Sequence, residues 1–346
     1  MKPGAIALWF LLACPLFAQV APTTVSDYAF QPSADEGYIQ AWNAEFRGQG
    51  TYLYVTFVIS NTGPGTWNNG VSILALKDGK NRVWTAEYSI RSLKAPPGQF
   101  GHKSGLSQIG YNEKGHLVVH AVVPGGGASP PESMSIDLVI EPASPGVRIS
   151  GGPLQPVPGS FLRADIPVTS GRATAVVKIG GKEETLQGVG GLEAIHSNHS
   201  PHSYAKRFLL IRTFSSDRGI FVGGYFGRSE NEFLLRYAIM EKGKITSSGP
   251  VKRVETAVSE KDGFSGYVIP KSVRYVLEND CQITENRAFF TGGFDVLNSV
   301  SAVLRWILRV FFARPYVMHY SANLLYTCGA QNTPAEAQAS YYLINP

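Results

Sequence analysis

Short apolar runs separated by turn-forming residues constrain the fold of this chain more than any other feature of the sequence. The run TYLYVTFVIS at 51–60 is rich in β-branched and aromatic residues and lies between the turn segments GQG and NTGPG, which predicts a strand. Asp78 and Gly79 stand between two further apolar runs and predict a hairpin. We expect an all-β, antiparallel protein with strands at 38–58, 70–76, 82–90, 115–123, 133–141, 161–168, 173–179, 184–189, 207–213, 220–225, 233–241, 251–258, 266–269, 273–277, 287–290 and 317–327.

The length of 346 residues indicates two domains, because a single hydrophobic core rarely serves more than about 250–300 residues. By composition, 98–107 and 124–131 are loops. The Pro- and Gly-rich stretch 141–160 has the composition of a linker, but the strands that follow it could close a first sheet or open a second. Composition therefore leaves the boundary open. We expect two antiparallel barrels or sandwiches.

The N-terminus predicts export. Lys2 precedes an apolar run over 5–17, and Ala18 is a small residue suited to cleavage. We interpret 1–18 as a signal peptide and expect the mature protein in the bacterial periplasm or outside the cell. The alternative is a lipoprotein, because the motif LLAC resembles a lipobox that would leave the mature chain anchored through Cys14.

Two cysteines remain in the mature chain, Cys281 and Cys328. An oxidising compartment would let them pair, and the alternative is two buried free thiols. We predict a disulfide. It would close a loop of about 48 residues, for which the chain-entropy model gives roughly 4 kcal/mol of stabilisation.

One segment has helical periodicity. Residues 295–313 place apolar side chains at helical spacing, with Arg305 and Arg309 away from the apolar stripe. This amphipathic helix could dock on a barrel or lie on an anionic membrane surface, where Arg314 would add to the attraction. It is not expected to span a membrane, because the two arginines interrupt its apolar segment.

Three of the seven histidines, His196, His199 and His202, lie in the stretch 188–208. A glycine pair and a proline predict irregular backbone there, and such passages often carry function. The spacing H-x-x-H-x-x-H could gather a metal on a helix, but the sequence does not favour a helix and we expect no metal. In an extended chain His196, Asn198 and His202 point to one side and would line a polar cavity. A solvated loop is the alternative.

No catalytic or cofactor motif stands out. The sequence has no G-x-S-x-G elbow, and its Gly-rich segments lack the strand-to-helix setting and the lysine of a P-loop. The net charge of +5 is small, and no basic run is long enough to indicate nucleic acid binding. We therefore expect no cofactor and no nucleic acid partner.

Aromatic residues on or beside the predicted strands favour an apolar ligand. A closed barrel of about eight strands either fills with side chains or encloses one such molecule. Core filling is the simpler interpretation for any one aromatic residue. Beyond the histidine stretch, we expect the ligand-binding residues to be Trp42, Trp67, Trp84, Tyr225, Tyr316 and His319.

Three passages resemble the Svf1-like (survival factor 1) family of the lipocalin-like superfamily, which also includes hydroxyneurosporene hydratases and Diels-Alderase-type cyclases. They are the hairpin FLRADIPVTSGRATAVVKIGGKEETLQGVG, the pattern P-H-x-x-A-x-R-aromatic that begins at Pro201, and the basic helix followed by Arg314-Pro315-Tyr316 and Tyr320. The match spans most of 38–325. The D-H-x-W-G motif of the hydratase branch is missing.

The resemblance implies two lipocalin-like β-barrels in tandem, one over 22–190 and one over 191–346 with the C-terminal helix. It also implies a lipid or polyprenoid cavity at or between them, and for the Svf1 branch the binding and transfer of ceramide.

Our leading hypothesis is an exported, monomeric, non-enzymatic binder or carrier of a lipid-like ligand such as a ceramide, fatty or isoprenoid lipid. The alternative is a hydratase, isomerase or cyclase acting on an apolar polyene or terpenoid, with His202 or Glu193 as acid or base. A third class, a β-rich adhesion or scaffold module, would have filled barrels and no cavity.

Overall fold

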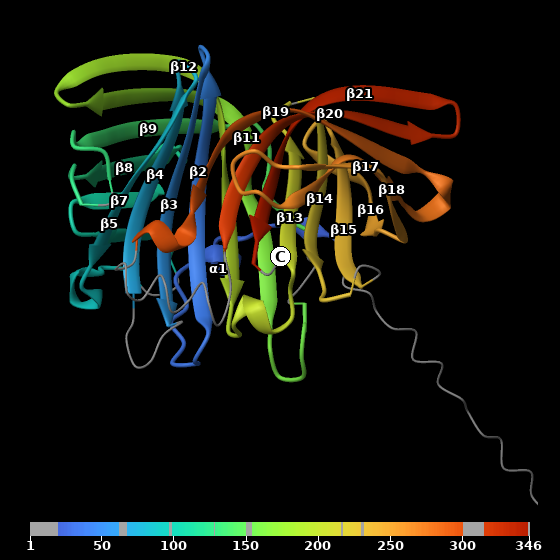
Figure 1. The fold of residues 1–346 in the computed structure, drawn as a ribbon, viewed down its shortest axis with the longest axis horizontal. Coiled ribbons are helices and arrows are strands. Elements are labelled where there is room, and N and C mark those ends of the chain that lie inside the picture. The colour runs from blue at the N-terminus through green and yellow to red at the C-terminus, as the bar shows by residue number, and fades with distance from the viewer. Residues whose placement is uncertain are drawn as a thin grey trace, which may run out of the picture.

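The computed structural model describes residues 20–61, 68–96, 99–127, 129–149, 154–215, 217–229, 232–299 and 315–344. Nearly all of its regular structure is β. Two antiparallel sheets lie side by side, the first from the N-terminal half of the chain and the second from the C-terminal half (Figure 1). The fold is thus all-β, as the strand pattern predicted. None of the helices in this part of the chain has the length and apolar character that crossing a membrane requires.

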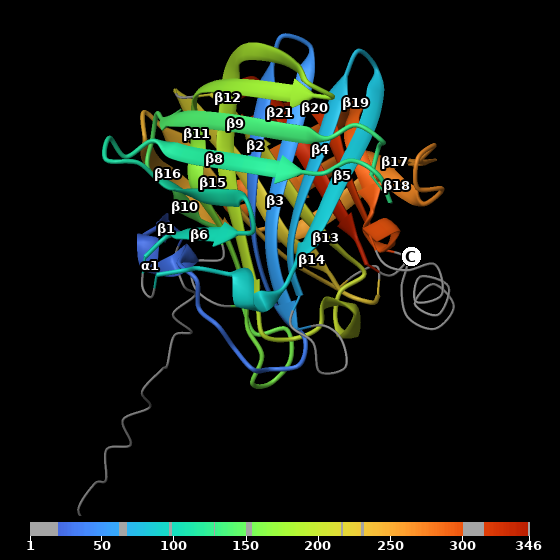
Figure 2. The same cartoon turned by 90° about the vertical axis from the view of Figure 1, so that its left-hand side faces the viewer.

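The first sheet has twelve strands and curls into a barrel. Its strands are β1 (Ala21–Pro22), β2 (Tyr38–Gly48), β3 (Thr51–Asn61), β4 (Asn68–Lys77), β5 (Lys80–Tyr88), β6 (Gly101–Ser104), β7 (Ser107–Tyr111), β8 (Leu117–Val123), β9 (Met134–Pro142), β10 (Val147–Arg148), β11 (Leu162–Ile179) and β12 (Lys182–Ser197). The main path runs β5-β4-β3-β2-β12-β11-β9-β8-β7-β6, with β10 on β11 and β1 on β10. Figure 2 shows β8 and β9 crossing in front of β2 and β3, as curling requires.

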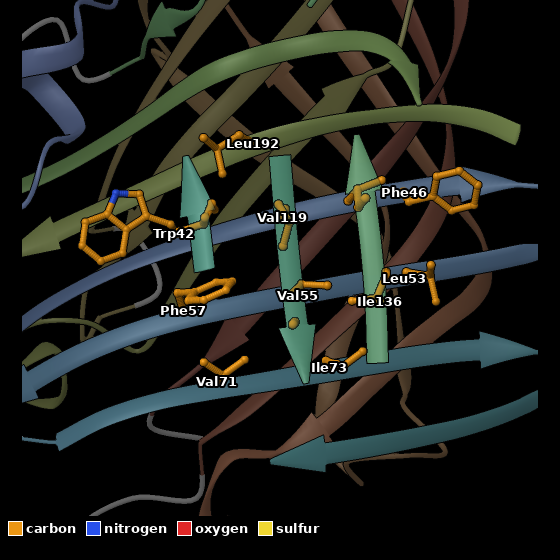
Figure 3. Packing of buried hydrophobic residues seen from close by; sticks show 14 of the residues in the cluster. Trp42, Phe46, Leu53, Val55, Phe57, Val71, Ile73, Val119, Ile136 and Leu192 are labelled. Atoms are coloured by element: carbon orange, nitrogen blue, oxygen red, sulfur yellow. The ribbon is translucent and has the colours of Figure 1, made fainter. Parts of the chain in front are cut away.

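Apolar side chains fill this barrel. Trp42, Phe46 and Phe57 from β2 and β3 face Val119 and Ile136 from β8 and β9, and all five are buried (Figure 3). Burying one large apolar side chain contributes about 1.5–3 kcal/mol. The inside of the first barrel is therefore a packed core.

The second sheet has nine strands and forms a half-barrel, where the resemblance implied a closed one. Its strands are β13 (Arg207–Thr213), β14 (Arg218–Phe226), β15 (Phe233–Glu241), β16 (Lys244–Pro250), β17 (Arg253–Lys261), β18 (Val268–Val276), β19 (Gln282–Asp295), β20 (Tyr316–Cys328) and β21 (Gln331–Leu343). They follow the order β16-β15-β14-β13-β21-β20-β19-β18-β17. Its concave face carries a second core with buried Ile211, Tyr275 and Tyr341.

A disulfide joins two strands of the second sheet. Cys281, just before β19, is bonded to Cys328, the last residue of β20. This is the pairing expected from the sequence, and it ties together the start of one long strand and the end of the next.

The histidine stretch is more regular than expected. β12 continues through Gly190 to Ser197, and only 198–206 is irregular before the next strand joins the second sheet. The expected domain boundary near residue 190 thus lies inside β12. Gly190 allows close packing instead of a turn, because a Cβ there would lie 2.6 Å from the backbone oxygen of Glu45.

Short helical turns connect the strands. They are α1 (Val25–Tyr28), η1 (Ile90–Ser92), η2 (Pro201–Ser203), η3 (Glu278–Asp280) and η4 (Val296–Ser299). Of the predicted helix 295–313, Asp295 ends β19 and η4 follows it, while the rest lies outside the described residues. Arg305, Arg309, Arg314 and Trp67 also lie outside them.

The two sheets pack through their outer faces. Ile149 and Ile166 of the first half lie in one buried cluster with Phe221 and Met240 of the second. We call this contact the seam: the outer faces of β2, β3, β11 and β12 against those of β13, β14, β20 and β21. The candidate site lies within it.

Candidate active site

Strand alternation places polar side chains in the seam. On β2, Trp42, Ala44 and Phe46 enter the barrel core, so Glu45 between them points outward. On β13, Ile211 enters the second core, and Arg212 points outward in the same way. Each sheet covers the outer face of the other, so these outward charges are shielded from water.

Two carboxyl groups and one guanidinium meet at the centre of the seam. Arg212 Nη2 lies 3.4 Å from Glu45 Oε2, and Arg212 Nε lies 3.9 Å from Glu193 Oε1. All three side chains are at most 1% exposed. Gly191 makes room for the guanidinium, because a Cβ there would lie 2.8 Å from Arg212 Nη2. We call Glu45, Glu193 and Arg212 the seam triad.

Tyrosine hydroxyls surround the triad. Tyr342, on β21, donates to Glu193 Oε2 at 2.8 Å. Its oxygen lies 2.8 Å from the hydroxyl of Tyr54 on β3, and either of these two groups could be the donor. Tyr54 and Tyr342 thus form a short hydroxyl chain that crosses the seam and ends on Glu193.

A buried histidine packs beside this chain. His319, on β20, is fully buried, and its Nδ1 lies 2.9 Å from Ser340 Oγ. Its ring centroid lies 4.2 Å from that of Tyr54 and 5.4 Å from that of Tyr52. Burial, with a smaller effect from the Arg212 charge, lowers the pKa of His319 to about 3. The imidazole is therefore neutral at pH 7.

Burial also decides the protonation of the acid pair. Burial raises the pKa of Glu45 well above its usual range against the opposing pull of Arg212, and the negative charge of Glu193 adds to the rise. The pKa of Arg212 is raised by Glu45 and Glu193, although its burial acts in the opposite direction. Burial therefore favours the neutral form of Glu45 beside the Arg212 cation.

Several buried polar atoms in the seam lack a hydrogen-bond partner among the described residues. They include the hydroxyl of Tyr52, one oxygen of Glu193 and three guanidinium nitrogens of Arg212. Buried polar groups in proteins are nearly always paired, so an unpaired group calls for a specific explanation. Within the triad, the ion pairs of Arg212 with Glu45 and Glu193 offset part of the cost of burying these groups.

An open groove runs along one end of the seam. Its volume is ≈ 1050 Å³, and both sheets contribute to it. Tyr52 lies on its wall and extends into the triad's surroundings. Phe214 also lines it, and the Arg212 guanidinium carbon lies 4.5 Å from the centroid of that ring. Phe214 thus borders both the groove and the guanidinium of the triad.

A second cavity lies within the seam beside Glu193. It is narrow, at ≈ 40 Å³, and its lining includes Glu193 and Tyr342. Most of its wall is apolar, with Leu162, Ile195 and Phe208 among the contributors. Glu193 therefore borders this small, mostly apolar cavity.

The structure brings two of the residues expected from the sequence into this site, Glu193 and His319. The histidines at 196–202 do not converge there. His196 is buried on β12 against Tyr38 and Phe161, with burial lowering its pKa to about 4. His202 is exposed on η2. Among the described residues no three histidine, cysteine or acidic side chains are placed to hold a metal ion.

The remaining expected residues lie elsewhere. Trp42 and Trp84 are fully buried in the first core, where their indole N–H groups donate to backbone oxygens at 2.7 and 2.8 Å. Asn198 accepts a hydrogen bond from the backbone N–H of Phe161. Tyr225 belongs to a small apolar cluster at the seam, and Tyr316 packs beside the second core.

Sequence reasoning did not single out Glu45, Arg212, Tyr52, Tyr54 or Tyr342. A signal was present: Glu45 interrupts the apolar run AWNAEF, and Arg212 interrupts RFLLIRTF. A charged residue inside an otherwise apolar strand points either to water or to a second packed layer. The sequence does not distinguish these two alternatives. The structure does, because a second sheet covers both strands.

No family model matches the sequence, and no curated protein matches it either. Solved structures resemble the fold. The crystal structure of an AttH candidate from Nitrosomonas europaea has a TM-score of 0.62 at 10% identity, covering 88% of this chain and 92% of that one. Kievitone hydratase from Nectria haematococca gives 0.53 at 9%, covering 93% of each chain. CghA gives 0.51 at 13%, covering 94% of this chain and 93% of that one.

These identities are so low that the likeness concerns the fold alone. It does not single out the Svf1-like family that the sequence resembles.

Proposed function

We propose that this protein is an enzyme that moves protons to and from an apolar, unsaturated molecule bound at the seam. The observation that carries the proposal is the buried pair Glu45 and Glu193 sharing one arginine. Burying two acids and one base between sheets is costly unless their charges are used or well compensated. Two carboxyl groups with different protonation are a frequent arrangement for acid and base catalysis.

The two acids take different roles. Glu45 keeps a proton at neutral pH and is the acid, since burial favours its uncharged form. Glu193 accepts from the Tyr342 hydroxyl and lies beside Arg212, two contacts that favour a carboxylate, so it is the base. Such paired proton transfer typically contributes about 10²–10⁴-fold to a rate.

Hydration illustrates how atoms and charges balance. Glu45 gives its proton to one carbon of a C=C bond, and water adds to the other carbon. Glu193 takes the proton that this water loses. A proton returned from Glu193 to Glu45 restores the starting state. Isomerisation or cyclisation would use the same addition and removal of a proton without the water.

The fold and the cavities favour an apolar substrate. The open groove of ≈ 1050 Å³ has room for such a molecule and offers the rings of Phe214 and Phe289 to it, and the low dielectric around the buried triad strengthens the charges there. A hydratase is among the solved structures with this fold. That likeness is compatible with the proposal and carries no substrate over to this chain.

A binder or carrier of a hydrophobic lipid-like molecule is the second candidate, favoured by the same groove and its aromatic side chains. Because the first barrel is packed with side chains, the ligand would sit at the seam and not inside that barrel. Both candidate functions assume export to an oxidising compartment, and the disulfide supports that assumption. Contact of Arg305, Arg309 and Arg314 with anionic membranes stays a prediction.

The two candidates differ in one experiment. Purified protein is incubated with a panel of polyenes and terpenoids, and products are detected by mass spectrometry. An enzyme of this kind converts a member of the panel, and Glu45→Gln and Glu193→Gln each lower turnover about 10²-fold or more. The control is Glu285→Gln, a fully buried acid in the second core that accepts from Tyr275 and Tyr341. Tight binding without conversion by the unaltered protein would favour the carrier.

A further inference from the structure

The groove at the end of the seam contains an arginine without an acidic partner. Arg47, on β2, lines the groove and makes no ion pair among the described residues. Its guanidinium carbon lies 5.6 Å from the centroid of the Phe214 ring. Arg218, in the same groove, is different: Glu241 lies 2.6 Å from its Nη2, and its Nη1 donates to Thr333 at 2.6 Å.

The groove lining carries charges of both signs, with Arg47, Arg218 and Lys242 beside Asp217, Glu241 and Glu336. Two guanidinium groups, Arg47 and Arg212, lie beside two carboxyl groups, Glu45 and Glu193. Arg212 contacts both acids, whereas Arg47 extends into the groove. Glu45 acts on Arg47 only through its longer-range charge, and no acid among the described residues lies within ion-pair distance of Arg47. Arg47 therefore can contact an acidic group of a ligand.

The groove around Arg47 suits a largely apolar molecule. Phe214 and Phe289 contribute ring surface, and Phe289 is 61% exposed. The buried hydroxyl of Tyr52, which has no hydrogen-bond partner among the described residues, lies on the same wall. An exposed aromatic surface beside an unpaired cation and a buried polar group is the composition that an amphipathic acid would match.

We propose that the groove binds its ligand through a carboxylate, which pairs with Arg47 while the apolar body lies on Phe214 and Phe289. This rests on the proposed function, because it names the substrate class of the same seam: an apolar unsaturated molecule that carries an acidic group. The carboxylate supplies the acidic contact that Arg47 lacks among the described residues, and the groove leads the rest of the molecule toward the triad.

The test compares a polyene acid with its neutral ester. The fluorescence of cis-parinaric acid and of its methyl ester is titrated against the purified protein with its disulfide intact. The unaltered protein should bind the acid about tenfold or more tightly than the ester, which corresponds to one charge-assisted contact. Arg47→Gln should remove this preference, and Arg47→Lys should keep part of it.

Lys242→Gln is the matched control. Lys242 lines the same groove, is exposed, and carries the same charge, so it reports any long-range attraction of anions to this end of the molecule. The subsite is contradicted if Lys242→Gln lowers the preference as much as Arg47→Gln does, or if Arg47→Gln keeps it. Circular dichroism and the unfolding midpoint establish that each variant folds, and Arg47→Lys provides the answer should Arg47→Gln fail to fold.

A further variant separates this inference from the proposed function. Glu193→Gln should abolish turnover and still prefer the acid over the ester. If Arg47→Gln loses the preference while Glu193→Gln turns over normally, the groove binds acids but the acid pair is not catalytic. If Glu193→Gln loses turnover while Arg47→Gln keeps the preference, the enzyme stands and the carboxylate subsite is wrong.

Discussion

The hydroxyl of Tyr342, on the second sheet, donates a hydrogen bond of 2.8 Å to the carboxylate of Glu193, on the first. This bond crosses the seam at its centre, where Glu193 is buried and Tyr342 is half-buried. It therefore couples the packing of the two sheets to the state of the acid pair. Changes at the seam should alter stability and chemistry together.

Tyr342→Phe removes that donor and leaves the Glu193 carboxylate with fewer partners. An unsatisfied buried acceptor typically costs about 1–3 kcal/mol, more when it is charged. We expect a loss in the free energy of unfolding of at least that size, measured by urea denaturation. The control is Tyr316→Phe, which removes a hydroxyl at the start of β20, outside the seam, and should change stability by far less. Equal effects of the two variants would contradict the role given to the bond.

Arg212→Met leaves two buried acids without their cation. Breaking a buried charge cluster by removing one partner typically costs about 3–5 kcal/mol. The pKa of Glu45 is already raised in the folded protein, and without Arg212 it would rise further. Such a group stabilises the fold below its unfolded pKa and loses that contribution as pH rises. The difference in the free energy of unfolding between the variant and the unaltered protein should therefore be smallest near pH 4 and largest above pH 7. Urea denaturation across this range that shows the opposite trend would exclude this account of the triad.

The sequence predicts the orientation of the Glu45 side chain but not its pairing with Arg212. Alternation along β2 predicts that Glu45 points away from the core, but the same pattern describes a strand with one face in water. Only the second sheet, which packs on that face, turns Glu45 and Arg212 into buried partners. Pairing of 45 with 212 depends on tertiary packing between separate sheets, and no local pattern encodes it.

Among the strands, too, those with a local sequence signal were predicted, and one that depends on tertiary packing was not. TYLYVTFVIS became β3 and the hairpin at Asp78-Gly79 joins β4 to β5, because β-branched runs and turn residues act locally. β21 was missed, although it is central in the second sheet. Its sequence QNTPAEAQASYYL has few residues of high strand propensity and contains a proline. Its small residues fit there because Ala337 and Ala339 are packed fully inside the core.

Asp165→Asn should stabilise the protein at alkaline pH. Burial raises the pKa of Asp165 from 3.8 to about 7, with Arg163 opposing the rise. A raised folded pKa means that stability is fully present below pH 3.8 and lost as pH rises through 7. The variant should thus gain about 2–4 kcal/mol over the unaltered protein at pH 8 and nothing at pH 3.5. Urea unfolding at both values tests this, and a gain that does not change with pH would point to a cause other than ionisation.

His102→Leu should reduce the loss of stability in acid. His102 is buried in the first barrel, 4.4 Å from the ring of Trp42, and burial lowers its pKa to about 3. A lowered histidine pKa means that stability is present above the unfolded pKa of 6.5 and lost as pH falls toward 3. Between pH 7 and pH 5 the loss from one such histidine is about 2 kcal/mol. His116→Gln, on the rim of β8, is the control and should leave the acid sensitivity unchanged.

Deuterium transfer from solvent to ligand tests the central claim most directly. A polyene or terpenoid that binds the protein is incubated with it in D₂O, and the label in the recovered molecule is measured by mass spectrometry. Proton addition by the acid pair predicts deuterium incorporation by the unaltered protein and by Glu285→Gln, and little or none by Glu45→Gln or Glu193→Gln. Bound ligand recovered unlabelled from the unaltered protein, or labelled equally by Glu193→Gln, would contradict an enzymatic role for the seam.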